Sequence, residues 1–303
     1  MKSARRTTAG AVVIAVLLAL SAAAPSRVIA KDEVRALWVV RTSLTSPKAI
    51  DDMIAGAQHG GFNTLLVQVR GRGDAYFLGG IEPRPASLIS QPAFDPLAET
   101  IAKGHARGLA VHAWINVNLV SGTDVPGGRA HIAYRHPEWL MVPQQLGDDL
   151  ARLEPGGPEY LGRLMRDARA RTPEVEGLYL SPATAGAVEY TTSVVRDIVQ
   201  RYGVDGVHFD YVRYPGGDFD YGRETLRAFG QDPAKSPDRW RQFRAERLTV
   251  LMTALHDVVK RARPTAEVSV AVAPDPAEAS VRHSQDWSRW LTAKLVDVVY
   301  PTF

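Results

Sequence analysis

Residues 208–215, with the sequence HFDYVRYP, place a histidine and an acid directly after the short apolar run 204–207. Such a run followed by polar residues is typical of a buried strand that ends in a loop. Because side chains alternate along a strand, His208 and Asp210 would share one face and the apolar residues the other. A carboxyl group at a strand end can serve as general acid, base or nucleophile. Asp210 is the leading catalytic candidate, and the alternative is a structural ion pair with Arg213.

This segment resembles the signature of the family 10 glycosyl-hydrolase-like proteins of bacterial envelopes. The likeness continues, in order along the chain, through Arg35–Val39, Phe62–Arg70, Gly73–Phe77, Phe94–Leu97, Arg107–Asn116, His136–Trp139 and Tyr179–Pro182. The resemblance implies an α/β fold of the (β/α)8 TIM-type barrel, a sugar-polymer substrate and hydrolysis by carboxylates. The sequence departs from the family pattern at Ala185-Gly186, where Pro-Glu would be expected to open a helix.

Two further strand patterns carry polar residues of one parity toward their carboxyl ends. Gln68 and Arg70 share a parity in the second strand, and His112, Trp114 and Asn116 share one in the third. In a parallel β/α barrel, the carboxyl ends of the strands meet at one rim, where catalytic groups are found. The pattern therefore predicts that three successive strands send polar groups to the same rim as Asp210.

Cleavage of a glycosidic bond normally needs two carboxyl groups, one that protonates the leaving oxygen and one that acts as nucleophile or activates water. Asp210 is assigned as nucleophile or base. Asp275 follows the fifth strand with matching parity and is its expected partner, although Pro274-Asp-Pro276 is also ordinary turn chemistry. Glu82, in the loop after the second strand, is the reserve, and the alternative for it is a solvent-facing loop acid.

Sugar binding favours aromatic faces for stacking and amide, guanidinium or imidazole groups for hydroxyls. The expected substrate-binding residues are Gln68, Arg70, Tyr76, His112, Trp114, Asn116, His208, Tyr211, Arg213 and Tyr214. Core filling is the alternative for Trp114, and interior histidines with satisfied hydrogen bonds are the alternative for His112 and His208. Trp38 is assigned to the core.

Two rival functions follow from the same residues. His208, Asp210 and His112 could bind a metal in a metallohydrolase, but no second histidine pair or HExxH helix accompanies them. We therefore expect no metal and no cofactor. The other rival is a barrel that binds glycans without cleaving them. The acidic stretch 218–224 lacks the spacing of a calcium loop and is interpreted as a solvated loop.

The elements that must position these residues alternate between strand and helix patterns. Strand patterns occur at residues 34–40, 62–69, 109–115, 204–210, 268–273 and 295–300. Helix patterns begin at Ser46-Pro47, Asp95-Pro96, Thr184 and Ser236-Pro237. Six strand patterns are present where a closed barrel needs eight, so we expect a barrel truncated after about the sixth strand. The long excursion 117–183, rich in Gly and Pro, is expected to build a wall of the cleft.

Residues 1–30 have the features of a secretory signal peptide, with basic residues before an apolar stretch and small residues up to Ala30. Residues 31–303 would then form the barrel, exported to the periplasm or the extracellular space without a stable membrane anchor. Residues 1–30 contain four of the 36 basic residues and no acid, so 32 basic and 33 acidic residues follow, a net charge of −1. This balance does not favour a nucleic-acid partner. Because the chain has no cysteine, a disulfide framework or thiol nucleophile is excluded.

Overall fold

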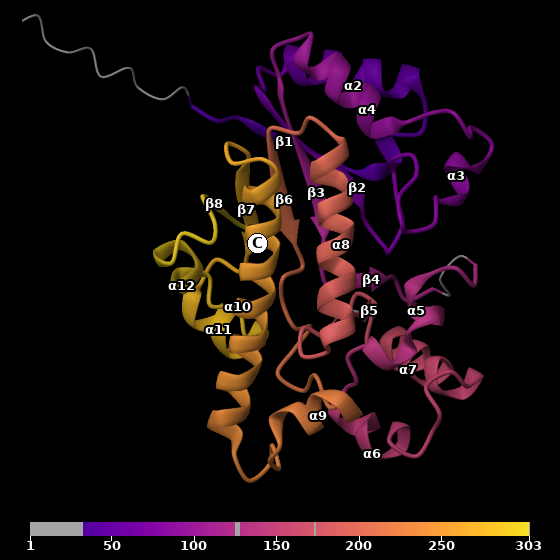
Figure 1. Ribbon diagram of the computed structural model, residues 1–303, viewed down its shortest axis with the longest axis vertical. Coiled ribbons are helices and arrows are strands. Elements are labelled where there is room, and N and C mark those ends of the chain that lie inside the picture. Colours follow the sequence, from indigo (N-terminus) through magenta and orange to yellow (C-terminus); the bar gives the residue numbers. More distant parts are fainter. Residues whose placement is uncertain (1–32, 125–127, 173, 303) are drawn as a thin grey trace, which may run out of the picture. The chain divides into compact units, whose positions relative to one another are not determined.

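Six parallel strands form the central sheet, in the order β1-β2-β3-β6-β7-β8 (Figure 1). The computed structural model describes residues 33–124, 128–172 and 174–302, and the chain from Arg35 onward forms one compact unit. The expected signal peptide lies outside the described residues. The strands of the sheet are β1 (Ala36–Val39), β2 (Thr64–Arg70), β3 (Ala110–Asn116), β6 (Gly206–Asp210), β7 (Glu267–Val272) and β8 (Val298–Pro301).

The helices that follow the strands begin where the sequence predicts. In α2 (Pro47–His59), the Ser46 hydroxyl accepts a hydrogen bond from the backbone N–H of Ala49 at 3.2 Å. In α4 (Pro96–His105), the Asp95 carboxylate accepts from the N–H of Ala98 at 3.1 Å. Each cap accepts a hydrogen bond from a first-turn backbone N–H that has no partner within the helix. The proline at the first helical position has no backbone N–H of its own, so one fewer donor needs a partner. The long helices α8 (Ala185–Arg201) and α10 (Pro237–Ala262) also match their predicted segments.

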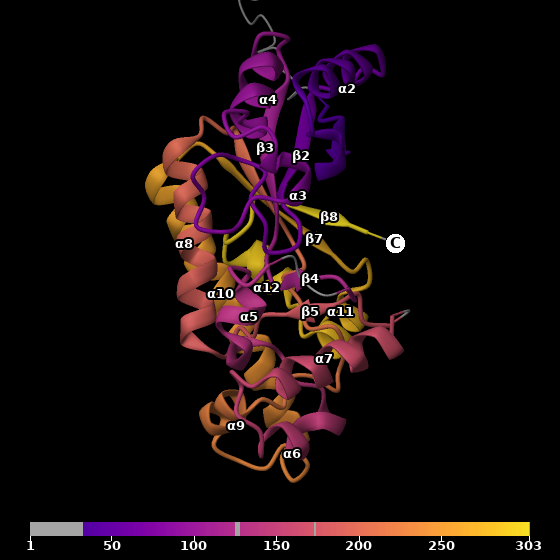
Figure 2. The same ribbon diagram turned by 90° about the vertical axis from the view of Figure 1, so that its right-hand side faces the viewer.

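One face of the sheet is apolar and covered by helices. Its buried residues form a continuous hydrophobic core and include Leu65, Val67, Val111, Ala113, Ile115, Val207, Phe209, Val268 and Val270. Helices α8 and α10 pack against each other along this face (Figures 1 and 2). The predicted alternation is confirmed, because His208, of the other parity, packs instead against the rings of Trp38, Trp114 and Tyr300.

The opposite face is concave and lined by polar and aromatic side chains. The sheet curls until the ring of Trp38, on edge strand β1, lies 5.5 Å from that of Tyr300, on edge strand β8. Both rings also pack edge-on against His208 of β6. Trp38 is 40% exposed, so its assignment to the core was wrong; it belongs to the concave face.

The excursion 117–183 has secondary structure of its own. Strands β4 (Leu119–Ser121) and β5 (Leu178–Tyr179) pair antiparallel. Between them lie α5 (Ile132–Arg135), α6 (Gly147–Leu150), α7 (Pro158–Ala170) and the short 3-10 turns Pro137–Trp139 and Gln144–Leu146. The remaining helical elements of the described residues are Arg41–Ser43, α3 (Ala86–Ile89), α9 (Arg223–Phe229), α11 (Pro276–His283) and α12 (Trp287–Thr292).

The acidic stretch 218–224 is not the solvated loop that the sequence suggested. Asp220 is fully buried, and its carboxyl oxygens accept hydrogen bonds from the N–H of Val142 at 3.1 Å and the hydroxyl of Thr225 at 2.9 Å. Burial raises the pKa of Asp220. The stretch therefore fastens the excursion, through Val142, to the start of α9.

Gly186, where the sequence departs from the family pattern, lets an indole ring lie directly on α8. A methyl group at this position would come within 2.4 Å of the Trp139 ring. That ring is itself fixed, since it stacks on His136 with a centroid separation of 3.7 Å. Because Gly186 has no side chain, Trp139 of the excursion can pack directly on the first turn of α8.

Gly186→Ala should lower the free energy of unfolding by about 1–3 kcal/mol, the usual cost of overpacking. The sign is informative, because alanine normally stabilises a helix by about 1 kcal/mol relative to glycine. Urea denaturation measures the difference. Gly56→Ala is the control, since Gly56 lies inside helix α2 and a methyl group there meets nothing within 4 Å. A Gly186→Ala protein as stable as the control would show that Trp139 is not fixed against α8.

Candidate active site

Asp210 ends β6 with its carboxyl group held by two donors. The backbone N–H of Tyr211 donates to Oδ1 at 2.7 Å, and the indole N–H of Trp114 donates to Oδ2 at 3.2 Å. Tyr211 has a φ of 54°, a left-handed conformation that tyrosine rarely adopts. Strained backbone of this kind persists where the surrounding structure enforces it, often at functional sites. Here the strained residue supplies the N–H that orients the carboxyl group.

A row of polar side chains crosses the sheet beside Asp210. The strand register places Asn116 of β3 next to Asp210. The Gln68 amide donates to Asn116 at 3.4 Å, and the Arg41 guanidinium donates to Gln68 at 3.0 Å. Asn116 also donates to the carbonyl of Gly71 at 2.9 Å. Gln68 and Asn116 are buried, so they form the floor of the rim and hold its loops in place.

Asp210 opens into a cleft of about 750 Å³, a volume within the range of ligand sites. Four carboxyl groups line it: Asp210, Glu176, Asp275 and Glu278. Its other polar lining residues are Tyr211, Arg213, His283, Gln285 and Thr302. Of the residues singled out from the sequence, Asp210, Asp275, Tyr211 and Arg213 therefore share one cleft. Gln68, Trp114, Asn116 and His208 lie in the sheet beside it.

Asp275 has a second task at the mouth of the cleft. It is the N-cap of α11, and its Oδ1 accepts from the backbone N–H groups of Ala277 at 2.7 Å and Glu278 at 3.0 Å. The turn chemistry considered from the sequence is therefore present. The exposed carboxyl group of Asp275 lines the same cleft as Asp210. Asp275 can therefore cap α11 and also take part in a reaction in the cleft.

Glu176 is a cleft carboxyl group that the sequence reasoning missed. It follows α7 in the excursion and accepts a hydrogen bond from the Tyr179 hydroxyl at 2.8 Å. The same oxygen, Oε2, forms an ion pair with the Arg213 guanidinium at 3.2 Å. The pairing of β4 with β5 carries it to the rim, and no parity or spacing signal marks that antiparallel pairing in advance. The nearby family segment Tyr179–Pro182 was the one available signal.

The structure removes Arg70 and Glu82 from the cleft. A register shift after Gln68 pairs Arg70 with Ile115, so the parity argument does not extend to Arg70. Its fully buried guanidinium forms a bidentate ion pair with Glu82, with both N···O distances 2.7 Å. Glu82 also accepts from the Tyr190 hydroxyl at 3.1 Å. Glu82 is thus neither a solvent-facing acid nor a cleft carboxyl group, and this pair has a structural role.

Three other expected sugar contacts are buried in this structure. Tyr76 belongs to the hydrophobic core. Tyr214 is fully buried beneath the guanidinium of Arg244, 5.2 Å from its ring. His112 lies deeper in the sheet, 3.8 Å from the Glu267 carboxylate. Aromatic residues are found both in hydrophobic cores and in sugar-binding sites. Residue type alone therefore could not distinguish a core role from a sugar-binding role for Tyr76 and Tyr214.

The histidines of the sheet are neutral interior groups. His208 is fully buried, its Nδ1 lies 3.0 Å from the Ser269 hydroxyl, and burial lowers its pKa to about 3. Burial also lowers the pKa of His112. Within the described ranges, no group of three or more histidine and acidic side chains is arranged to hold a metal ion. The described residues also contain no helix long and apolar enough to cross a bilayer.

The protonation of Asp210 is set mainly by its surroundings. Burial raises the pKa of the Asp210 carboxyl group, while the Tyr211 N–H, the Arg213 charge and the Trp114 N–H oppose that rise. Burial likewise raises the pKa of Tyr211 to about 12. A carboxyl group with a raised pKa beside other, more exposed carboxylates is the arrangement by which one fold separates an acid from a base.

Similar proteins were found by sequence. Glycosyl hydrolase DigH of Escherichia coli K12 is 27% identical over 286 residues, covering 84% of this chain and 57% of that protein. Glycosyl hydrolase YngK of Bacillus subtilis 168 is 24% identical over 280 residues, covering 84% of this chain and 47% of that protein. The chain thus spans about half the length of these curated relatives.

Solved structures with the same fold include the PgaB (BpsB) glycoside hydrolase domain from Bordetella bronchiseptica, with a TM-score of 0.61, 15% identity and coverage of 89% of this chain and 74% of that one. Alpha-L-fucosidase isoenzyme 2 from Paenibacillus thiaminolyticus has a TM-score of 0.52 and 19% identity, with coverage of 78% and 32%. The barrel-type α/β fold expected from the sequence is confirmed. Because the family model for "Glycosyl hydrolase-like 10" matches residues 33–303, this chain belongs to the glycosyl hydrolase-like 10 family, as its motifs indicated.

Proposed function

We propose that this protein is an exported enzyme that hydrolyses O-glycosidic bonds of a bacterial envelope or extracellular polysaccharide. The observation that carries the proposal is the position of Asp210. Its half-buried carboxyl group opens into a cleft that is lined by three further acids. The glycoside-hydrolase type of its family supports the reaction class. Export rests on the signal-like residues 1–30. Peptidoglycan glycan strands are the first substrate to test.

Asp210 is proposed as the general acid rather than as the nucleophile or base assigned from the sequence. Its raised pKa favours the protonated form, which can transfer a proton to the glycosidic oxygen. The bond between that oxygen and the anomeric carbon then breaks, and the leaving sugar departs as an alcohol. The carboxyl group of Asp210 must regain a proton before the next cycle.

Glu176 is proposed as the second carboxyl group. Its ion pair with Arg213 keeps a carboxylate in the cleft, reaching in from the excursion rather than from the sheet. Such a carboxylate can attack the anomeric carbon or take a proton from the attacking water, and water supplies the new hydroxyl in either case. Asp275 is less suited, because one of its oxygens is committed to two backbone donors of α11.

Asp210→Asn should lower the release of reducing ends from purified glycan strands by about 10²- to 10⁴-fold, the usual contribution of a general acid. Binding of the same strands should persist, since asparagine keeps the shape of the side chain. A reducing-end assay and sedimentation with insoluble glycan measure the two effects. If wild-type protein binds glycan but never releases reducing ends, the protein is a glycan-binding barrel and not a hydrolase.

Trp114→Phe should move the basic limb of the kcat profile to higher pH. The indole N–H lowers the pKa of Asp210, so its removal raises that pKa and keeps the acid protonated to higher pH. Activity below the limb should change little. Trp240→Phe is the control, because the ring of Trp240 packs on Phe243 and does not line the cleft. An unmoved limb in Trp114→Phe would remove Asp210 from the role of acid.

Glu176→Gln should reduce kcat by at least about 10²-fold, whereas Asp275→Asn should stay within about tenfold of wild type. Asparagine preserves the cap of α11, so the comparison isolates chemistry from folding. Glu278→Gln, at the same rim, serves as the control. A larger loss in Asp275→Asn than in Glu176→Gln would transfer the role of second carboxyl group to Asp275.

A further inference from the structure

A second groove lies in the excursion, between α5 and α7, with a volume of about 500 Å³. Its apolar lining includes Ala133, Tyr134, Pro137, Leu161 and Met165, of which all but Tyr134 are buried. Gly162 of α7 also faces it and leaves room where a side chain would project. None of these residues lines the cleft around Asp210.

Three exposed arginines surround the groove: Arg129, Arg166 and Arg169. Over the described parts of the chain, none of the three forms an ion pair with an acid. Arg169 donates only to the carbonyl of Thr123, at 3.4 Å, and Arg129 lies 5.9 Å from the ring centroid of Tyr134. No acidic residue lines the groove. Its positive charge is therefore not balanced from within the described structure.

Two other arginines, one on α7 and one directly after it, do form ion pairs with acids. Arg163 pairs with Glu159 at 2.7 Å and with Asp149 at 2.8 Å. Arg171, which follows α7, pairs with Asp218 at 2.8 Å. Among the arginines of α7, only Arg166 and Arg169, which face the groove, lack such partners in the described residues, so the pairing of charge on this helix follows its faces. This pattern distinguishes the groove from an ordinary solvated helix surface.

The active-site cleft has the opposite character. Four acids line it, against one arginine and one histidine. The groove should therefore attract a carboxylate more strongly than the cleft does. The excursion contributes to both sites, because the chain that leaves α7 delivers Glu176 to the cleft.

We propose that the groove between α5 and α7 binds a carboxylate-bearing section of the polysaccharide on which the protein acts. This proposal rests on the proposed function. The planar guanidinium groups of Arg166 and Arg169 suit carboxylates, which they can bind with two parallel hydrogen bonds. Tyr134 and the prolines offer apolar surface for sugar rings. The groove would hold the polymer while the cleft around Asp210 takes the section that is cut.

A galacturonic-acid oligomer is a suitable probe, with its methyl ester as the uncharged counterpart. Isothermal titration calorimetry should detect binding of the acid by the full protein and an affinity at least about tenfold lower for the ester. The double variant Arg166→Gln/Arg169→Gln should lose at least about tenfold in affinity for the acid. Gly162→Phe should lose binding too, because it fills the groove without changing charge. A methyl group at Gly162 meets only the end of the Arg166 side chain, at 3.4 Å, so folding should be retained.

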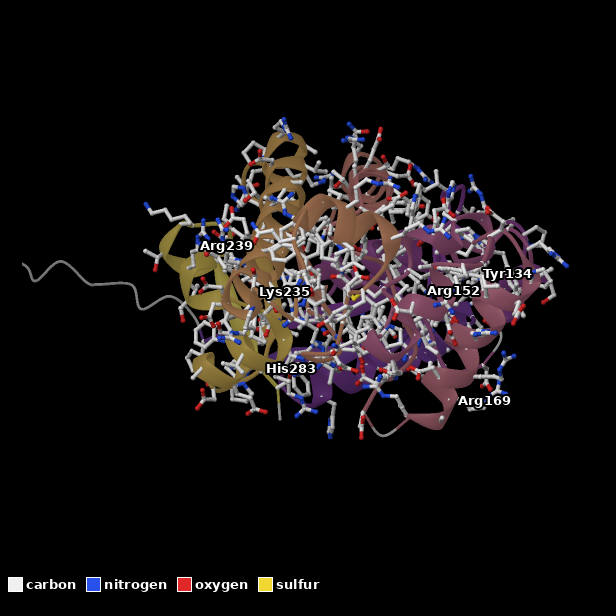
Figure 3. All side chains as sticks on the ribbon, turned by 90° about the horizontal axis from the view of Figure 1, so that it is seen from below. Tyr134, Arg152, Arg169, Lys235, Arg239 and His283 are labelled. Carbon is white, nitrogen blue, oxygen red and sulfur yellow. The ribbon has the colours of Figure 1, made fainter. Side chains whose placement is uncertain are left out.

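Arg152→Gln is the matched control. Arg152 is exposed and lies on the same lobe as Tyr134 and Arg169, far from Lys235 and Arg239 (Figure 3), but it does not line the groove. Its substitution should leave the affinity unchanged. Asp210→Asn should bind the oligomer as wild type does, while Arg166→Gln/Arg169→Gln should still cleave uncharged glycan, so failures of groove and active site are distinguishable.

Three results would overturn the groove proposal. One is an equal loss of affinity in Arg152→Gln and in the double variant, which would indicate a diffuse charge effect. Another is equal affinity for the acid and its ester. The third is binding of a DNA duplex as tight as that of the oligomer and equally reduced by Arg166→Gln/Arg169→Gln, which would indicate a general polyanion surface.

Discussion

The rim of the sheet depends on the buried ion pair between Arg70 and Glu82. Besides Glu82, the guanidinium of Arg70 donates to the carbonyls of Asn116 and Val117, and Glu82 receives the hydroxyl of Tyr190. One cation thus ties together the end of β2, the end of β3, the loop of Glu82 and helix α8. Removing one partner of such a pair typically costs about 3–5 kcal/mol, because the other charge is left buried and unpaired. The excursion leaves the sheet at Val117, so its starting point is fixed by this pair.

From that fixed rim, the site follows by alternation along the strands. Residues of one parity bury apolar side chains under α8 and α10, and those of the other parity form the concave face. At the end of β6, Tyr211, whose backbone has a left-handed conformation, supplies the N–H that binds the Asp210 carboxyl group. The sheet thus sets the position of the Asp210 side chain, and the N–H of Tyr211 orients its carboxyl group. Burial is the main influence on the pKa of that group. Each of these effects acts on Asp210 without requiring a bound ligand.

The sequence predicted what depends on local patterns and missed what depends on partners distant in the chain. Apolar alternation and Ser-Pro or Asp-Pro caps located the strands and the main helices, because these signals act over a few residues. The parity of Asp210 was predicted for the same reason. The register shift at Arg70 and the burial of Asp220 were not, since each is decided by a partner far along the chain. Glu176 was missed because only the β4 and β5 pairing brings it to the cleft.

Acidic and basic side chains are concentrated in different parts of this molecule, although its net charge is close to zero. Acids gather in the cleft around Asp210, while the arginines of the groove on α7 have no acidic partners among the described residues. A cluster of like charges is costly for folding, so its presence requires a compensating reason. For the cleft, the proposed acid chemistry supplies that reason, because burial and then the neighbouring Glu176 carboxylate raise the pKa of Asp210. For the groove no such reaction is available, since guanidinium groups do not titrate near neutral pH. Guanidinium groups beside an apolar floor are suited to bind an anion, which agrees with the ligand proposed for the groove rather than with a second catalytic centre.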